Sequence, residues 1–429
     1  MTTNAELLAR YRNALPSFCN PLHSEPISID RGEGSYVYGV EGDKYLDWFG
    51  GVLTTMIGHS NPEVVKAVQD QAAKAMHTST LYLSEPMIRF AEEVAAVSGI
   101  PDARVFFTAS GTEANDTAIM MATQYRKSNE VLAMRNSYHG RSFSSQAITS
   151  HSSWTVQNMS GLHVNFVQGG YRLRSPFRSL DDDAYTTACV DDLVQLLHMN
   201  TAGNVAAMIA EPIQGVGGFA TPPDGFFGAM KKELDNREIL FISDEVQTGW
   251  GRTGENFWGY QAHGIVPDML TFAKGVGNGI TLAGVVARAD IMDSITALSF
   301  STFGGNPLST AAGSATLKYV LENDLQGNAK RMGEHMQKRL APVVDDTDWI
   351  AELRGRGLMQ AIETVHPGGI EPDAAASARL LDECKSRGLL VGKGGLYGNV
   401  IRMAPMLTIS EAEMDEGIDA LIASIKAMS

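Results

Sequence analysis

From about residue 100 onward, short apolar runs alternate with amphipathic stretches. Two of these stretches, 112–127 and 226–236, have helical spacing. Six apolar runs have the length of buried strands: 103–110, 131–136, 204–212, 238–246, 268–275 and 282–291. Alternating βα units are typical of a mostly parallel sheet covered by helices. The pattern therefore predicts an α/β fold for the middle of the chain.

The two ends of the chain show other patterns. Residues 1–30 form a leader, and Gly34–Asp47 has the alternation of a small hairpin. Asn61 is a suitable N-cap for a helix that begins at Pro62, where proline suits the first helical position.

Near the C-terminus, a long helical region covers Pro307–Leu340 and a final helix covers Glu411–Met428. Three short strand candidates lie between them, at 357–363, 389–395 and 400–405. The C-terminal part therefore resembles a separate α+β domain, connected by the long helix.

Composition narrows the class of protein. The chain has 429 residues, 44% of them hydrophobic and 19% charged, which is ordinary globular composition. Its net charge of −15 gives no cationic footprint for nucleic acid. No run reaches the roughly 20 apolar residues of a membrane span, and the first residues lack a signal-peptide pattern. We expect a soluble, cytoplasmic protein.

Cysteine and acidic residues add little chemistry. The three cysteines, Cys19, Cys189 and Cys384, are far apart and odd in number, so we interpret them as buried free thiols in a reducing compartment. An acidic run at 181–183 is interpreted as a solvated loop. His59, His77 and His139 show no metal-ligand spacing, and we assign them no catalytic role and expect no metal site.

The main candidate catalytic residues lie at the ends of two predicted strands. Asp244 closes one strong apolar strand, and Lys274 follows the next, thirty residues on. Ligand groups in open α/β sheets gather at the carboxyl ends of strands, so these two side chains are expected over one crevice. A lysine amine can form a Schiff base with a carbonyl cofactor. Pyridoxal 5′-phosphate (PLP) also needs an acidic partner for its ring nitrogen, so the pair favours PLP.

A second element begins where strand 103–110 runs into Ser110-Gly111-Thr112 and a helix starts. Free backbone N–H groups and the helix dipole make such an end an anion site. A plain helix cap is the simpler interpretation of these residues alone. Together with Lys274 they favour a phosphate cradle.

Further motifs extend over roughly residues 35–415: YLDWFGGVLTTMIGHSNPEVVKA, SGTEANDTAI, SYHGRS, AEPIQGVGG, SDEVQTGWGRTG, FAKGVGNG, STFGGNP, LRGRGLM and IRMAP. In these segments and their order the chain resembles the class III (ω-amino acid) aminotransferases of PLP fold type I, and within them bacterial relatives of alanine–glyoxylate and 4-aminobutyrate aminotransferases. The resemblance implies a large domain with a mostly parallel seven-stranded sheet and a smaller α+β domain. The expected boundaries are 1–58 (part of the small domain), 59–325 (large domain) and 326–429 (small domain).

The resemblance also implies cofactor roles. Lys274 would bind PLP covalently and move the proton, Asp244 would pair with the ring nitrogen, and Gln247 would bind the ring oxygen. Tyr138 would stack on the ring. The phosphate would be held by four residues, Ser110, Gly111, Thr112 and, from a partner subunit, Thr302. A homodimer with shared sites follows from this last role, and the dimer could pair into a tetramer.

Substrate specificity is expected at four positions. Similar enzymes use arginines at the positions of Arg141 and Arg402 for substrate carboxylates, and a glutamate at Glu211 pairs with the second arginine when a monocarboxylate is bound. Arginine suits this task because its planar fork donates two bonds to a carboxylate. Val52 replaces the tyrosine of ornithine enzymes, which favours a short, unbranched ω-amino acid.

The resemblance predicts a ping-pong transaminase that passes through pyridoxamine phosphate. The amino donor would be 4-aminobutyrate, β-alanine or alanine, and the acceptor 2-oxoglutarate, pyruvate or glyoxylate. The alternative is another PLP reaction on the same scaffold: racemase or epimerase, 2,1-aminomutase, or dialkylglycine-type decarboxylase. A cofactor-free relative is disfavoured by the retention of Lys274, Asp244 and Gln247.

Overall fold

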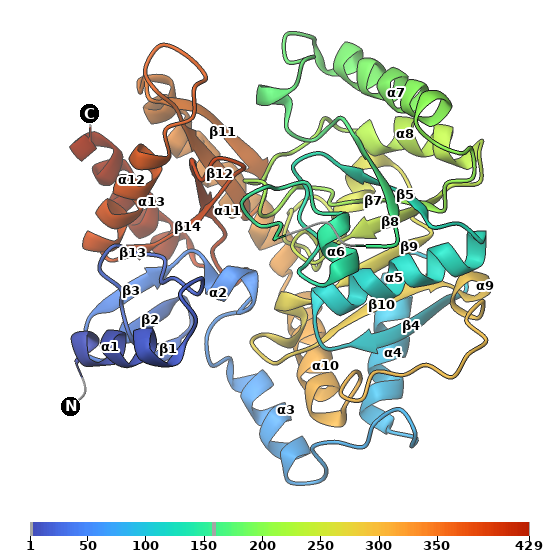
Figure 1. Cartoon of the computed structure of the whole chain (residues 1–429). Coiled ribbons are helices and arrows are strands. Elements are labelled where there is room, and N and C mark those ends of the chain that lie inside the picture. The colour runs from blue at the N-terminus through green and yellow to red at the C-terminus, as the bar shows by residue number, and fades with distance from the viewer. Residues whose placement is uncertain (1–2, 157–159, 429) are drawn as a thin grey trace.

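The computed structural model describes residues 3–156 and 160–428. Its largest sheet has seven strands in the order β4-β10-β9-β8-β7-β5-β6 (Figure 1). Their bounds, in that order, are Ala103–Thr108, Ala283–Arg288, Met269–Phe272, Leu240–Asp244, Ala207–Ala210, Glu130–Met134 and His163–Val167. Strand β10 is antiparallel to both of its neighbours, and the remaining pairs are parallel. The predicted α/β fold with a mostly parallel seven-stranded sheet is confirmed.

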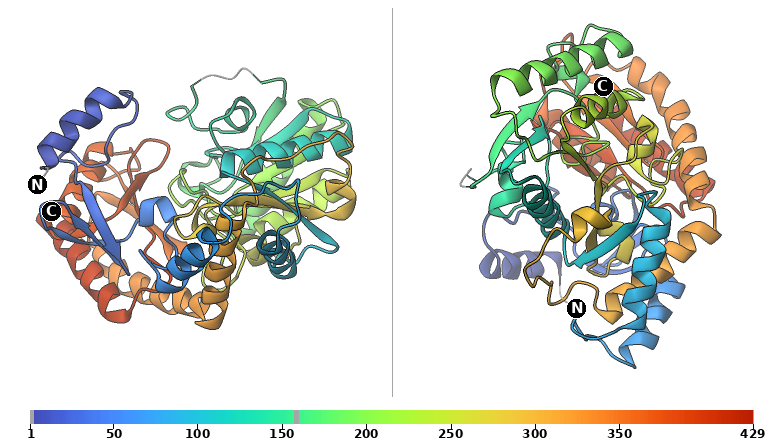
Figure 2. Two further views of the ribbon diagram at one scale, coloured as in Figure 1. Left: turned by 90° about the horizontal axis from the view of Figure 1, so that it is seen from below. Right: turned by 90° about the vertical axis from the view of Figure 1, so that its right-hand side faces the viewer.

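Helices cover both faces of this central sheet (Figure 2). Along β5, Val131 and Ala133 pack on the side of α5 (Gly111–Arg126). The alternate residues Leu132 and Met134 pack against the other cover, made of α7 (Asp182–Met199) and α8 (Phe226–Asp235). Both faces of the strands are therefore buried, which explains why they are continuous apolar runs in the sequence.

Two four-stranded sheets stand beside the central sheet. One contains β1 (Ile29–Glu33), β2 (Tyr36–Gly39), β3 (Lys44–Asp47) and β13 (Leu389–Leu390); the other contains β11 (Ile350–Arg356), β12 (Met359–Thr364), β15 (Val400–Met403) and β14 (Gly392–Gly394). Strand β13 pairs in parallel with β3, so the two ends of the chain share one sheet. This agrees with a small unit built from both termini, although its exact boundaries stay a prediction.

The remaining helices connect and flank these sheets. Their bounds are α1 Asn4–Ala14, α2 Gly50–Leu53, α3 Pro62–Ala72, α4 Glu85–Val97, α6 Phe143–Ala147, α9 Ala289–Met292, α10 Pro307–Glu322, α11 Leu325–Asp345, α12 Ala374–Ser386 and α13 Glu411–Met428, with 3-10 turns η1 Arg172–Arg174, η2 Gly259–His263 and η3 Lys274–Gly277. Within the described residues, none of the helices is long and apolar enough to cross a membrane.

Four expectations require correction. The acidic run is not a loop: Asp181 caps α7, accepting a bond from the Ala184 N–H at 2.9 Å, because acidic side chains stabilise helix N-termini. The long helical region is two helices, which separate at Asp324 in a left-handed conformation. The leader contains α1 and β1, and Cys19 is exposed rather than buried.

Candidate functional site

The carboxyl ends of β8 and β9 meet at the centre of the large sheet. These strands pair in parallel, with Asp244 opposite Thr271, and Lys274 begins the 3-10 turn η3 two residues after β9 ends. The predicted juxtaposition of Asp244 and Lys274 is therefore confirmed: both side chains line one cavity of about 200 Å³. Seven of the predicted residues line it: Gly111, Thr112, Tyr138, Glu211, Asp244, Gln247 and Lys274.

Lys274 lies in an environment that favours its neutral amine. Burial, together with the positive charge of Arg402, lowers the pKa of this amine to about 8, even though Asp244 and Glu211 act in the opposite direction. The backbone of Lys274 is left-handed, with φ 52°, which is uncommon for a residue with a side chain and is concentrated at functional sites. A lysine in this state can act as a nucleophile and a base close to neutral pH.

Asp244 is held by a buried network. Its Oδ2 atom accepts bonds from Asn115 Nδ2 at 2.8 Å and lies 2.7 Å from His139 Nδ1, while Oδ1 accepts from the Val246 N–H at 3.1 Å. Thr271 Oγ1 in turn donates to Asn115 Oδ1 at 2.7 Å. These contacts fix the position of the carboxylate, as a partner for a ring nitrogen requires.

Asn115 and His139 were not predicted as site residues. His139 was assigned no catalytic role, but its ring contacts Asp244 directly and is fully enclosed. Two signals point to them in the sequence: Asn115 lies one turn into the helix that follows Gly111, and His139 is next to Tyr138. Neither signal reveals a contact with Asp244, which depends on how three strand ends converge.

The N-terminus of α5 faces the same cavity through Gly111 and Thr112. The first N–H groups of a helix have no intrahelical acceptor and attract anions. A Cβ added at Gly111 would lie 3.2 Å from Val246, so glycine lets the backbone approach closely. Ser110 does not line the cavity. Its hydroxyl accepts from the Glu113 N–H at 3.2 Å, which is the helix-cap role.

Tyr138 and Gln247 complete the cavity. The half-buried Tyr138 ring lies edge-on to Trp154, with ring centroids 5.5 Å apart, and leaves an apolar face available for stacking. The buried Gln247 Oε1 atom has no hydrogen-bond partner among the described residues. Buried polar atoms are rarely left unpaired, so the Gln247 amide has unused hydrogen-bonding capacity at the cavity, and its Nε2 group is the donor that a ring oxygen would need.

Arg402 lies beside this cavity, on strand β15 of the sheet made by β11, β12, β15 and β14, which we call the C-terminal sheet. Its guanidinium is 5% exposed and donates only to carbonyl oxygens, those of Lys393 at 2.9 Å and Gly215 at 3.3 Å. The rings of Phe49 and Phe219 lie 4.9 and 5.6 Å from its central carbon. Among the described residues, no carboxylate forms an ion pair with it. A buried guanidinium without a counterion is costly unless a ligand supplies one.

In this structure Glu211 and Arg402 do not form an ion pair, and the pair expected when a monocarboxylate is bound stays a prediction. Glu211 instead accepts bonds from the backbone N–H groups of Tyr138 at 3.0 Å and Gly215 at 2.7 Å. Burial raises the pKa of this carboxyl group to about 7, although nearby His139 partly offsets the effect. At neutral pH Glu211 can therefore gain or lose its charge.

Besides Ser110 and Arg402, three predicted residues do not line the cavity. Arg141 is exposed beside Tyr138, and Thr302 is exposed in the loop before α10. Val52 is 37% exposed and lies in the α2 turn with φ 67°. A β-branched residue in this conformation is a backbone outlier, and such strain is often found near functional sites.

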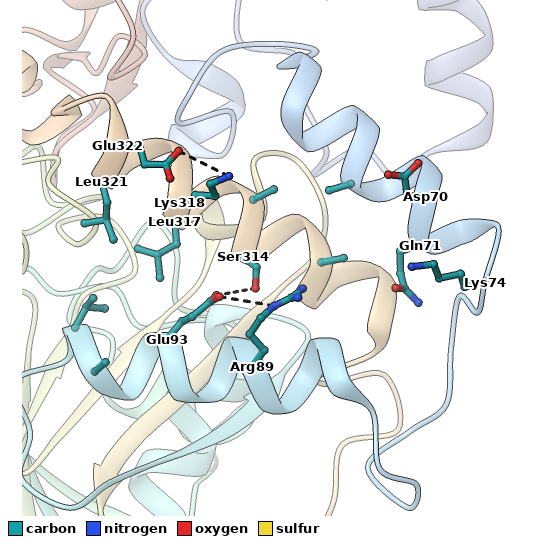
Figure 3. Close-up of a pocket in the computed structure, with 15 residues that line it drawn as sticks. Asp70, Gln71, Lys74, Arg89, Glu93, Ser314, Leu317, Lys318, Leu321 and Glu322 are labelled. Atoms are coloured by element: carbon teal, nitrogen blue, oxygen red, sulfur yellow. Dashed lines mark hydrogen bonds and ion pairs between the residues drawn. The ribbon is translucent and has the colours of Figure 1, made fainter.

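A larger cavity, of about 730 Å³, lies between α3, α4 and α10 (Figure 3). Several of its charged groups are paired with their neighbours: Glu93 contacts Arg89 and the Ser314 hydroxyl, and Lys318 contacts Glu322. It has none of the strand-end chemistry of the smaller cavity, so size alone does not locate the functional site.

The fold and the cavity together define a PLP enzyme of fold type I. The model of the aminotransferase class-III family matches residues 19–425, and the chain belongs to this family. It is 38% identical over 416 residues to alanine–glyoxylate aminotransferase 2 homolog 2, mitochondrial, of Arabidopsis thaliana, covering 96% of this chain and 85% of that protein. It is also 34% identical over 430 residues to the leucine/methionine racemase of Thermococcus litoralis, covering 97% and 94%.

Among solved structures, an amine transaminase from an uncultivated Pseudomonas species, in a PLP-bound form, superimposes with a TM-score of 0.91. The match has 29% sequence identity and covers 97% of this chain and all of that one (100%). The chain is therefore a PLP-dependent aminotransferase. The residues present fit the cofactor: an amine, a fixed carboxylate, a side-chain amide with unused hydrogen-bonding capacity and a helix N-terminus surround one cavity.

Proposed function

We propose that the amino donor is a short, unbranched amino acid, of the β-alanine, 4-aminobutyrate or alanine class, and that the acceptor is pyruvate, glyoxylate or 2-oxoglutarate. The observation that carries the proposal is the buried, unpaired guanidinium of Arg402. A carboxylate on the substrate would be its counterion and would accept two parallel bonds. Donor and acceptor both carry such a group, so one arginine serves both half-reactions.

Each side chain that lines the cavity has a separate role in the proposed reaction. PLP, when bound, supplies an electron sink for the carbon that bears the amino group. Lys274, whose amine has a pKa of about 8, would accept the proton released by this carbon at its Nζ atom and later give it back. Asp244 would be the partner of the ring nitrogen, Gln247 would bind the ring oxygen, and Tyr138 would orient the ring. The α5 N-terminus would hold the phosphate.

We assign Arg402 rather than Arg141 as the main carboxylate ligand. Arg402 is buried and has no counterion, whereas Arg141 is exposed, so water screens its charge. A second carboxylate, as in 2-oxoglutarate, would need a second cation, and Arg141 is the candidate for that group. A preference for monocarboxylates therefore follows if only Arg402 is engaged.

We propose that the active form is a homodimer. Two exposed apolar segments, around residues 77–83 and 298–303, lie side by side, since the rings of His77 and Phe303 are 5.1 Å apart. Leu83 is 93% exposed and Leu298 is 90% exposed, and such patches indicate a protein interface. Thr302 lies within this surface, where it could reach a phosphate in a partner's cavity. Leu83→Glu should give monomers in light scattering, with weaker PLP binding; an unchanged dimer would contradict this assignment.

The alternative function is a racemase, and the relative from Thermococcus litoralis carries that name. The two reactions differ in the fate of the amino group: a transaminase leaves it on the cofactor, whereas a racemase returns it to the substrate. The test is the visible spectrum of purified protein mixed with one amino donor and no acceptor. Loss of the cofactor's visible band with β-alanine or 4-aminobutyrate supports the proposal. A stable band together with racemised alanine would refute it.

A further inference from the structure

The turn Gly215–Gly218 connects the two parts of the proposed substrate site. On one side, the Gly215 N–H donates to Glu211 at 2.7 Å, and on the other the Gly215 carbonyl accepts from Arg402 at 3.3 Å. The Gly218 N–H also donates to this carbonyl, at 3.2 Å, and closes the turn. The position of the turn therefore sets the spacing between the Arg402 charge and the Glu211 carboxyl group.

Each remaining carbonyl of this turn accepts a bond from a different part of the chain. The Val216 carbonyl accepts from the Gly395 N–H at 2.9 Å, and the Gly217 carbonyl from Asn136 Nδ2 at 3.0 Å. The Gly218 carbonyl accepts from Arg354 Nε at 2.8 Å. Of the side chains that hold the turn, Arg354 is the one that is itself anchored by a buried ion pair.

That anchor is Glu363, on the neighbouring strand of the C-terminal sheet. Arg354 Nη1 contacts Glu363 Oε2 at 2.5 Å, and these side chains are 9% and 0% exposed. The arginine fork therefore joins β12 to the Gly218 carbonyl in one planar unit, a geometry that a lysine cannot reproduce. Strand β12 pairs with β15, which carries Arg402. Arg354 thus fixes the turn relative to the strand that presents the substrate-binding charge.

We propose that Arg354 is a positioning residue for substrate carboxylates: it holds the Gly215–Gly218 turn so that Arg402 and Glu211 keep the spacing that a carboxylate requires. This inference rests on the proposed function of Arg402. It goes further because Arg354 does not line the cofactor cavity and does not hydrogen-bond Arg402. Arg354 acts instead through its bond to the Gly218 carbonyl.

The chain offers a matched control in the same ionic cluster. Arg174 donates to Glu363 Oε1 at 2.7 Å and to the Ile370 carbonyl at 2.6 Å, but forms no contact with the turn. Arg174→Met therefore disturbs the buried carboxylate without releasing Gly218. In Arg354→Met, conversely, Arg174 still neutralises Glu363, so the fold is expected to survive.

The experiment measures kcat and KM for β-alanine, the inhibition constant of propionate and the Tm of each PLP-loaded variant. Arg354→Met should raise KM and the propionate constant about tenfold, with kcat within about twofold, since small misplacements of positioning groups are costly. Arg354→Lys should recover part of the loss, and it answers the question if the methionine variant does not fold. Arg174→Met should lower Tm but leave the propionate constant unchanged.

Equal increases in the propionate constant for Arg174→Met and Arg354→Met would overturn the proposal, because the effect would then come from general loosening of the ionic cluster. An unchanged constant in Arg354→Met would also overturn it. Arg402→Met separates this inference from the proposed function. If that variant binds propionate normally, the carboxylate role of Arg402 is itself wrong; if it loses binding while Arg354→Met does not, the positioning role alone fails.

Discussion

Replacing Gly215 with alanine should remove Gln247 from the cofactor cavity without touching Gln247 itself. A Cβ added at Gly215 would lie 2.0 Å from Gln247 Nε2, 2.3 Å from its Cδ and 2.7 Å from its Oε1. Since Cβ contacts below 3.0 Å are essentially never seen, the amide nitrogen must move by at least 1.0 Å, the difference between 3.0 and 2.0 Å. Gly215 does not have a positive φ, so alanine can adopt its backbone.

A displacement of this size breaks the bond expected between Gln247 and the ring oxygen of PLP, because hydrogen-bond lengths vary by only a few tenths of an ångström. Loss of one such bond is worth about 0.5–1.5 kcal/mol, so the Kd for PLP should rise about 2- to 13-fold. The assay is titration of the cofactor-free protein with PLP, followed by the visible absorbance band. Gln247→Ala should show the same weakening.

The double variant gives the decisive comparison. The three atoms nearest to the added Cβ all belong to the Gln247 side chain, so Gln247→Ala removes the clash together with the bond. Gly215→Ala should then have no further effect in a Gln247→Ala background, and a double-mutant cycle should give a coupling energy as large as the single effect. If the two effects multiply instead, alanine weakens binding through the backbone and the steric reasoning is wrong.

Three further predictions concern the catalytic groups. Lys274→Ala should abolish turnover and the borohydride-reducible attachment of PLP while circular dichroism stays native; retained activity would refute its role. In the wild-type apoprotein, the rate of PLP attachment should rise with pH and level off above about 8, the pKa of Lys274. Unfolding restores the lysine pKa to 10.5, so between pH 8 and pH 10.5 the unfolded chain carries a proton that the folded chain lacks. Lys274 therefore makes the free energy of unfolding of the apoprotein rise with pH over this range. Asn115→Ala should lower kcat about 10- to 100-fold, because a buried bond to the Asp244 carboxylate is lost; an unchanged kcat would show that His139 alone suffices.

The elements that could be predicted from sequence are those whose signal is local. The buried strands that end at Asp244 and precede Lys274 are uninterrupted apolar runs, and their parallel pairing brings the two residues together by the general geometry of α/β sheets. Strand β6 was missed because it lies at the edge of the sheet and its burial is mixed. Helix α7 was missed because its first turn is acidic, a feature that solvated loops share.

Relations between distant segments could not be predicted. Arg141 and Arg402 each lie in a segment that matches the family, but Arg141 is exposed and Arg402 is buried. The difference arises because Arg402 packs against Phe49, Phe219 and the Gly215 carbonyl. These groups come from two parts of the chain, and both are distant in sequence from Arg402. Likewise, the contact of His139 with Asp244 joins positions 105 residues apart. No local periodicity encodes such contacts, which depend on the tertiary arrangement.

The charge on Arg402 links substrate binding to the basicity of Lys274. Burial lowers the pKa of Arg402 only to about 10, so it remains a cation at neutral pH. That cation is the second cause, after burial, of the low pKa of the Lys274 amine. A substrate carboxylate bound to Arg402 would neutralise it and raise the lysine pKa, which strengthens the base when a carboxylate substrate is in place. An amine without a carboxylate leaves the cation uncompensated, so Lys274 is a weaker base toward it. If Arg402 binds the substrate carboxylate as proposed, the buried arginine favours carboxylate substrates in two ways, through binding and through proton transfer.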